Sequence, residues 1–340
     1  MLKIDKKDVN FLVTSSMVKE AEDMLGKHRE TMDKFIDKMK SRKVDEIYFV
    51  ACGSPLCACQ TAQSLISKYS SIPAFSYSGL DFLSQTPYGL DENSVVIAIS
   101  DSGNTKEVVD SVKLAKNKGA LVLSLTKNPV GNLLADVSKN LLAYEGECIW
   151  VIHMLATYYI SLSYIQDKTN SPEPGIILKD LSKVPAALQV LLSTEEKSAE
   201  LGKLASSFPF LYTVASGPMY PLAYKEGIIT MLEFTWTHGS VINASEFRHG
   251  PLEVVDKDVP YVFLLGIDET REITERALNF VKKYSDNVFV FDAADYKLDL
   301  HPMLAPIYLF VPLEFFYYYL SINKDHNPDD RRYYGGLVEY

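Results

Sequence analysis

The first half of the chain alternates short, continuous apolar runs with longer segments that have helical periodicity. An apolar run without alternation is typical of a parallel β-strand that is covered on both faces. The order of runs and helical segments therefore predicts a parallel sheet wrapped by helices. Helices are expected within residues 16–42, and the predicted strands are residues 46–51, 73–77, 95–100, 121–125 and 141–144.

After the first predicted sheet the composition shifts over residues 167–185, which open with the turn-forming sequence Asp-Lys-Thr-Asn-Ser-Pro-Glu-Pro-Gly. It is poor in core-forming residues and predicts a domain boundary, so we expect one domain over residues 1–169 and a second over residues 170–340. A helical stretch, 187–206, then leads into another strand, 210–215. Short motifs of the first half recur in the second in the same order, at offsets of about 160 to 166 residues; Val-Ala-Cys-Gly, for example, returns as Val-Ala-Ser-Gly. Their shared order predicts an internally duplicated α/β unit.

The strand at residues 95–100 runs into a turn rich in hydroxyl groups, Ser-Asp-Ser-Gly-Asn-Thr. A strand that feeds a helix through a tight turn gathers backbone N–H groups and the positive end of the helix dipole. The hydroxyls of Ser100, Ser102 and Thr105 can add hydrogen bonds to an anion. Many such turns only reverse the chain, but three hydroxyls in one turn favour an anion site. Because no nucleotide or dinucleotide glycine motif accompanies the turn, we expect a small phosphate ester.

Two candidate groups for proton transfer lie in the second half. Residues 224–238 predict a helix on which Glu226, Thr230 and Glu233 share one face. A carboxyl group among apolar neighbours has a raised pKa and can pass a proton near neutral pH, although Glu233 could equally pair with a lysine or cap a neighbouring helix. His249 precedes Gly-Pro at a predicted chain reversal, and imidazole titrates near neutral pH. With no other catalytic motif present, a Glu/His proton-transfer pair is the remaining candidate.

Composition limits the classes of partner, the location and the cofactors that we expect for this protein. The formal charge of −10 over 340 residues argues against nucleic acid, which is bound mainly by clustered Lys and Arg. No signal peptide is recognised, so we expect a cytoplasmic protein. The apolar segments 149–165 and 307–322 approach membrane-span length, but the first contains His153 and the second Pro312 and Glu314, so both are expected to be buried core helices. The four cysteines lack metal-ligand spacing, and neither a metal nor a cofactor is expected.

Several separated motifs resemble those of sugar-isomerase (SIS) domains: Cys-Gly-Ser, Ile-Ser-Asp-Ser-Gly-Asn-Thr, and Lys-Glu-Gly with Glu-Phe-Arg-His-Gly-Pro. Their arrangement is similar to the isomerase half of glucosamine-6-phosphate synthase. Over nearly the whole chain, including Phe-Thr-Trp-Thr-His-Gly and the tail 324–340, it is closer to the fructosamine 6-phosphate deglycases of the fructoselysine 6-phosphate type. The resemblance implies two tandem SIS domains, each flavodoxin-like with a parallel sheet in three αβα layers. It also implies conversion of an Amadori 6-phosphate and water to glucose 6-phosphate and a free amino acid.

The same resemblance implies roles for individual residues. It assigns proton transfer to Glu233 and His249, and binding of the substrate phosphate to Ser54, Ser100, Asp101, Ser102 and Thr105. It further implies a homodimer with shared active sites, in which His249 reaches the partner's site and the tail, with Arg331, Arg332, Tyr333 and Tyr334, packs over a cleft.

The chain departs from the synthase in ways that fit a deglycase. Thr230 stands where the synthase helix has a lysine, no lysine follows His326, and no glutaminase domain is present. An Amadori substrate carries its own nitrogen, so a deglycase does not need those lysines. Two alternatives stay open. An aldose–ketose isomerase would use the same enediol chemistry without releasing an amine, and a non-catalytic sensor would bind a sugar phosphate without turnover.

Overall fold

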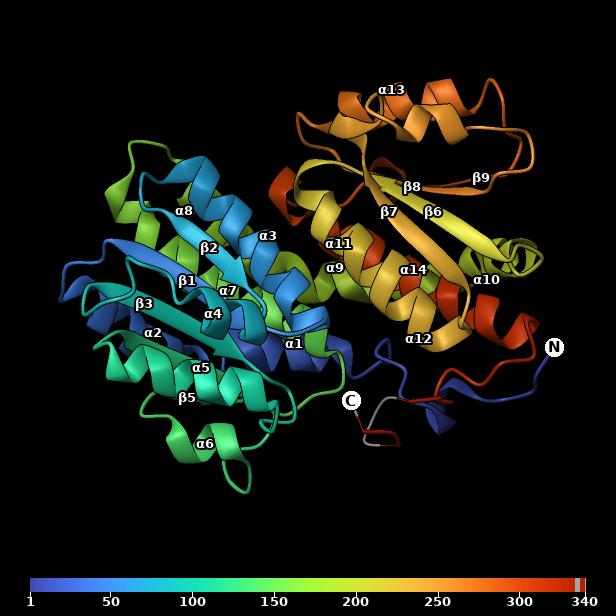
Figure 1. The fold of residues 1–340 in the computed structure, drawn as a ribbon. Helices are drawn as coiled ribbons and strands as arrows, with labels where there is room; N and C mark the ends of the chain where they lie inside the picture. The colour runs from blue at the N-terminus through green and yellow to red at the C-terminus, as the bar shows by residue number, and fades with distance from the viewer. Residues whose placement is uncertain (334–336, 340) are drawn as a thin grey trace. The chain divides into compact units, whose positions relative to one another are not determined.

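The computed structural model describes residues 1–333 and 337–339. It contains two compact units, one of residues Ser16–Ala186 and the other of Ala187–Tyr340 together with Met1–Ser15. Each unit has its own parallel β-sheet with helices packed against it (Figure 1). The predicted α/β architecture with parallel sheets is therefore confirmed. Tyr334, which the sequence assigns to a packed tail, lies outside the described residues.

The unit Ser16–Ala186 is built on a five-stranded parallel sheet in the order β2-β1-β3-β4-β5. This is the strand order of flavodoxin-like folds. All five strands predicted from the apolar runs are present, with ends within one or two residues of those expected. Their bounds are β1 (Glu46–Ala51), β2 (Ala74–Tyr77), β3 (Ser94–Ile99), β4 (Leu121–Thr126) and β5 (Leu141–Ala143).

Helices cover both faces of this sheet, which explains why the strands are apolar throughout. On β1, Tyr48 and Val50 point into a core that includes Val108 and Val112 of α5. Contacts among the helices place α1, α2 and α3 together with α7, and α4 and α6 together with α5. The helices are α1 (Met17–Leu25), α2 (Arg29–Lys40), α3 (Ser54–Tyr69), α4 (Gly79–Gln85), α5 (Lys106–Asn117), α6 (Leu133–Val137), α7 (Ile149–Ile165) and α8 (Glu173–Asp180).

The other unit has a four-stranded parallel sheet in the order β7-β6-β8-β9. In Figure 1, α13 (Arg271–Val281) lies on one side of this sheet, and α10 (Glu195–Ala205) and α14 (Ala305–Asn323) lie on the other. The helix predicted over 187–206 is divided, because a 3₁₀ turn at Leu192–Thr194 separates α10 from α9 (Val184–Leu191). The strands are β6 (Phe210–Ala215), β7 (His238–Asn243), β8 (Tyr261–Leu265) and β9 (Val288–Asp292).

The helix predicted over residues 224–238 is only partly correct. The chain forms α11 (Tyr220–Tyr224), then a π-helical segment (Lys225–Thr230), then α12 (Met231–Thr235). Trp236 has φ 48°, and a left-handed residue at this position ends a helix. The residues that follow form β7 instead of a further helical turn, so the end of the predicted helix was wrong.

Both long apolar segments are core helices, as predicted. Every residue of α7 after Ile149 is buried. The segment Pro302–Asn323, which includes α14, is long and apolar enough to cross a membrane, but 94% of its most apolar window is buried inside the structure. Burial within the protein explains the apolar character of both helices.

Candidate active site

The hydroxyl-rich turn after β3 and the Cys-Gly-Ser turn after β1 lie side by side. Strands β1 and β3 pair in parallel register from Glu46–Ser94 to Ala51–Ile99, so their carboxyl ends lie at the same edge of the sheet. From that edge the chain enters α3 at Ser54 and α5 at Lys106. Two helix N-termini at one edge offer several backbone N–H groups to an anion.

In the part of the chain that the structure describes, the hydroxyl groups of these turns either have no partner or are bonded only within the turn itself. The Ser54 Oγ is buried and has no hydrogen-bond partner among the described residues. Ser100 is 3% exposed, and its Oγ lies 2.8 Å from the Thr105 Oγ1. The Ser102 Oγ accepts a hydrogen bond from the backbone N–H of Asn104, at 3.2 Å. A bound phosphate could therefore be met by neutral donors without breaking an ion pair.

Gly103 allows the turn to take its shape. Its φ is 67°, and a Cβ at this position would lie 2.0 Å from the Asn132 Oδ1. The same Asn132 oxygen caps α6 by accepting the N–H of Ala135. The Gly103 carbonyl oxygen accepts the N–H of Leu134, at 2.8 Å. The turn is therefore held against α6, and only glycine fits at position 103.

Asp101 is engaged in a buried network that the sequence did not reveal. Its carboxylate accepts a hydrogen bond from the Tyr144 hydroxyl at 2.8 Å, and Tyr144 also contacts the His153 Nε2. Burial raises the pKa of Asp101 and lowers the pKa of His153 to about 3, so His153 is neutral at pH 7. Because the tyrosine proton is directed to Asp101, the neutral imidazole donates from Nε2. The Asp101 side chain thus braces the turn.

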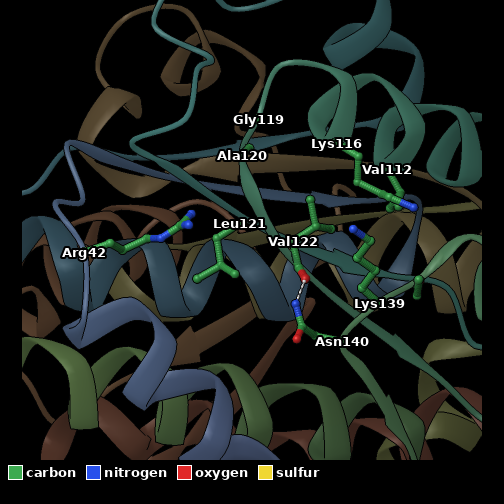
Figure 2. A pocket seen from close by; sticks show the side chains of 10 residues that line it. Arg42, Val112, Lys116, Gly119, Ala120, Leu121, Val122, Lys139 and Asn140 are labelled. Carbon is green, nitrogen blue, oxygen red and sulfur yellow. Dashed lines mark hydrogen bonds between the residues drawn. The ribbon is translucent and has the colours of Figure 1, made fainter.

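A surface pocket in the same unit lies away from these turns. It has a volume of about 240 Å³ and is bordered by Arg42, Lys116 and Lys139 (Figure 2). Its other lining residues include Leu121 and Val122, which begin β4. Because β4 starts here, the pocket lies at the amino edge of the sheet, opposite the edge that carries Ser100. It is therefore distinct from the predicted phosphate site.

The turn after β8 is closed by its own side chains. The Asp268 Oδ1 accepts hydrogen bonds from the N–H and the hydroxyl of Thr270, at 2.7 and 2.6 Å. Arg271 forms two hydrogen bonds with the Asp292 carboxylate, at 2.7 and 2.6 Å. The carboxylate of Asp268 would repel an anion. The turn after β8 is therefore less suited to an anion than the turn after β3.

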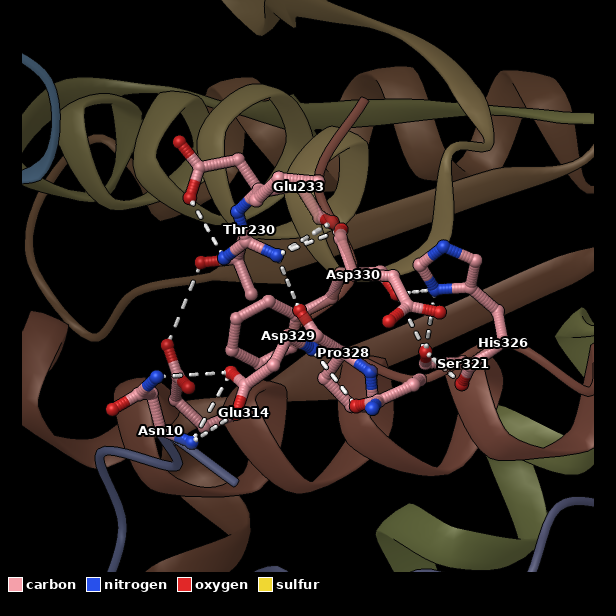
Figure 3. Close-up of polar contacts among 12 residues, drawn as sticks. Asn10, Thr230, Glu233, Glu314, Ser321, His326, Pro328, Asp329 and Asp330 are labelled. Atoms are coloured by element: carbon pink, nitrogen blue, oxygen red, sulfur yellow. Dashed lines mark hydrogen bonds and ion pairs between the residues drawn. The ribbon is translucent and has the colours of Figure 1, made fainter. Parts of the chain in front are cut away.

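Glu233 lies on α12 at the border between core and solvent (Figure 3). Its side chain is 41% exposed, and the Oε2 lies 3.6 Å from the Arg331 Nη2. Burial raises the pKa of the Glu233 carboxyl above its ordinary value, while the positive charges of Arg331 and Lys225 oppose that shift. The sequence allowed Glu233 to pair with a lysine. An ion pair is present, but its cation is Arg331 of the C-terminal tail. The carboxyl group is therefore partly desolvated and accessible, as a group that exchanges protons with a ligand must be.

His249 lies in an exposed turn, where Gly250 has φ 114°. Its backbone N–H donates to the Glu246 carbonyl oxygen at 2.9 Å. The predicted chain reversal is therefore present. No hydrogen bond or ion pair joins His249 to Glu233 in the described part of the chain, so the structure does not bring the two candidate groups into direct contact.

A buried charged cluster adjoins the Glu233 helix. Lys225 donates hydrogen bonds to Glu226, at 3.0 Å, and to Glu314 of α14. The side chain of Lys225 is 2% exposed, and those of both glutamates are 0% exposed. The Thr230 hydroxyl reaches the same Glu314 oxygen at 3.5 Å. Thus Glu226 belongs to the core, and the face that it was predicted to share with Glu233 is divided between core and surface.

Charge balance within the cluster favours one neutral carboxyl group. Burial raises the pKa of Glu226 to about 8, as does the negative charge of Glu314, while Lys225 acts in the opposite direction. Burial alone would lower the pKa of Lys225, but the two carboxyl groups outweigh it and raise that pKa. The lysine is therefore charged at pH 7, and the raised pKa of Glu226 favours a neutral carboxyl group beside it. The one signal in the sequence was a Lys-Glu pair within an apolar helix, and nothing local pointed to Glu314.

Comparison with known proteins places these features in a family. Residues 41–160 match the SIS domain family. The chain is 50% identical over 341 residues to the fructoselysine 6-phosphate deglycase of Escherichia coli K12, and the match covers 100% of both chains. A solved structure from Bacillus subtilis described as a phosphosugar isomerase has a TM-score of 0.84 and 31% identity, covering 92% of this chain and 97% of the other.

The predicted relation to the synthase is also found. The glutamine–fructose-6-phosphate aminotransferase (isomerizing) of Pyrococcus horikoshii is 28% identical over 310 residues, which is 85% of this chain and 51% of that protein. The match therefore involves only about half of the aminotransferase, as expected for its isomerase half. Full-length similarity at 50% identity is decisive: the chain belongs to the fructoselysine 6-phosphate deglycase family of SIS-domain proteins.

Proposed function

We propose that the protein is a fructosamine 6-phosphate deglycase that converts fructoselysine 6-phosphate, or a related Amadori 6-phosphate, and water to glucose 6-phosphate and the free amino acid. The observation that carries this proposal is 50% identity over the entire length to a fructoselysine 6-phosphate deglycase. The hydroxyl-lined turn at Ser100 and the partly buried carboxyl of Glu233 support it, because the reaction needs a phosphate site and a group that moves protons.

The reaction follows from the chemistry of the substrate. An amine on a saturated carbon is a poor leaving group, so the double bond must first move to C1. A base removes a proton from C1 and an enaminol forms; reprotonation at C2 gives an imine at C1. Water adds to this imine, and the carbon–nitrogen bond breaks to yield the aldose phosphate and the amine. We assign the two proton transfers to Glu233 and His249.

We assign binding of the phosphate to the turns at the carboxyl edge of the first sheet. Ser54, Ser100, Ser102 and Thr105 supply hydroxyl groups, and the N-termini of α3 and α5 supply backbone N–H groups. Asp101 contributes by bracing the turn through Tyr144, since its carboxylate would repel a phosphate. The unpartnered Ser54 hydroxyl supports this assignment, because buried polar groups normally have a hydrogen-bond partner.

We further infer that the two halves, residues 1–169 and 170–340, arose by duplication. The first half then binds the phosphate, and the second carries the groups that transfer protons. The orders β2-β1-β3-β4 and β7-β6-β8-β9 support a common origin because they are the same order of equivalent strands. We also propose a cytoplasmic homodimer with shared active sites. No disulfide joins any of the cysteines, which supports a reducing compartment. An active monomer in solution would refute the shared sites.

The test uses fructoselysine 6-phosphate and follows glucose 6-phosphate and lysine together. Equal amounts of the two products support a deglycase; a sugar phosphate without amine release would indicate an isomerase, and binding without product would indicate a sensor. We expect Glu233→Gln and His249→Asn each to lower kcat by about 100-fold or more, the usual contribution of a proton-transfer group. Glu253→Gln and His238→Asn, at exposed positions, are the matched controls. Near wild-type turnover in either test variant would remove that residue from the mechanism.

A further inference from the structure

The C-terminal tail, here residues 326–332, folds back onto the end of α12. The His326 Nδ1 donates to the carbonyl oxygen of Phe234 at 2.6 Å, and its ring lies 4.2 Å from that of Trp236. A second contact joins the tail to the N-terminal segment: the Asp329 carboxylate accepts a hydrogen bond from the backbone N–H of Asn10, at 3.0 Å. Figure 3 shows Asn10, Asp329 and His326 in these contacts. The tail is therefore fixed against the helix that carries Glu233.

This anchoring brings one guanidinium group to Glu233. The Arg331 Nη1 donates to the carbonyl oxygen of Pro328 and, at 3.4 Å, to the backbone carbonyl oxygen of Glu233. The Arg331 Nη2 lies 3.6 Å from the Glu233 carboxylate. Arg331 is 21% exposed and Glu233 41% exposed. One planar guanidinium group thus lies against both the backbone carbonyl oxygen and the carboxylate of the same residue.

Other charged groups around Glu233 are engaged elsewhere. Lys225 is bonded to Glu226 and Glu314, and Arg332 stacks on the Trp236 ring, 3.9 Å from its centre. Among the described residues, Arg331 is the ion-pair partner of Glu233. The titratable and charged groups on the surrounding elements are Lys225 and Glu226 on the same helical run, Glu314 on α14, His238 on β7, and His326, Asp329, Asp330, Arg331 and Arg332 in the tail.

We propose that Arg331 is a positioning residue for Glu233: it holds the carboxylate in one orientation and in its ionised form, ready to accept the C1 proton of the sugar. This inference rests on the proposed function and adds a direction to it, because an ionised carboxylate is a base. The role of general acid then falls to His249. A guanidinium group is suited to the task because it stays charged at any working pH.

The test is the pH dependence of kcat/KM for Arg331→Gln. Removing the positive charge disfavours the ionised carboxylate, so the acidic limb of the profile moves to higher pH and activity falls most at low pH. We expect kcat to fall by about ten- to a hundred-fold, the cost of a misplaced catalytic group, with a smaller change in KM. Arg331→Lys keeps the charge and should keep the acidic limb near its wild-type position, while recovering only part of kcat.

Arg332→Gln is the matched control, because it alters the same tail without touching Glu233. It should leave the acidic limb unchanged. An unchanged limb and kcat in Arg331→Gln would overturn the proposal, as would an equal shift in Arg332→Gln, which would indicate that tail packing alone is responsible. If Arg331→Gln does not fold, a wild-type acidic limb in Arg331→Lys supports the proposal and a shifted limb opposes it. An active Glu233→Gln would instead refute the role of Glu233 in the proposed function.

Discussion

Replacing Lys225 with methionine is expected to destabilise the unit that contains it by about 3–5 kcal/mol, the usual cost of removing one partner of a buried ion pair. Methionine has a similar length and no charge, so the packing of the stem is largely preserved. The change leaves Glu226 and Glu314, both 0% exposed, without the cation that they share. The loss is large beside the roughly 5–15 kcal/mol that stabilises a typical domain.

The magnitude can be checked against the chemistry of the cluster. One carboxyl group of the cluster is already favoured to be neutral at pH 7, because burial and the charge of Glu314 raise the pKa of Glu226. The variant can therefore relieve its remaining buried charge by protonating one more carboxyl group. Relative to the unfolded chain, in which a glutamate has a pKa of about 4.3, folding with that carboxyl group protonated costs about 3.7 kcal/mol at pH 7, at about 1.36 kcal/mol per pH unit. At pH 5 the same step costs only about 1 kcal/mol, so the effect of the substitution should shrink as the pH falls.

The assay is urea denaturation at pH 7 and pH 5, followed by tryptophan fluorescence in a Trp150→Phe background, so that the signal comes from Trp236 in the same unit as Lys225. Lys197→Met is the matched control. Lys197 pairs with Asp295 at 3.2 Å, and their side chains are 64% and 53% exposed, so its loss should cost at most about 1 kcal/mol. A loss below about 1 kcal/mol for Lys225→Met at pH 7, or a loss that does not shrink at pH 5, would refute the reasoning.

Three further changes test the fold and the phosphate site. Gly103→Ala should destabilise the chain by about 2 kcal/mol or more, measured by thermal denaturation, because the new Cβ would meet Asn132 and φ is 67°. Ser100→Ala should raise KM by about ten- to a hundred-fold with a smaller effect on kcat, since one hydrogen bond to a charged group contributes about 1.5–3 kcal/mol; an unchanged KM in steady-state assays would contradict the phosphate assignment. Glu226→Gln should flatten the fall in stability between about pH 4.5 and 8. In the wild type, the pKa of Glu226 is raised to about 8 in the folded protein, so the bound proton stabilises the fold fully below the unfolded pKa, and this stabilisation is lost as the pH rises through 8. Urea denaturation from pH 4 to 9 measures the free energy of unfolding against pH. Equal slopes for the wild type and the variant would contradict the prediction.

Local sequence patterns were sufficient where a strand is covered on both faces. Strands β1 and β3 are continuous apolar runs because helices exclude water from both sides, and such runs can be identified without any knowledge of their partners. The pattern failed at β7. Its burial alternates irregularly and most of the strand is at least partly exposed, so its sequence contains no strong signal that distinguishes an edge strand from the end of a helix.

The sequence by itself thus determined the α/β class, the five strands of the first sheet, the turn of hydroxyl groups after β3, and the choice of Glu233 and His249 as candidates. Only the tertiary structure decided which charges meet. Lys225 and Glu314 are 89 positions apart, and Arg331 reaches the Glu233 backbone across 98 positions. Propensity and periodicity act over a few residues, whereas these pairs form only because helix packing and the returning tail bring distant segments together.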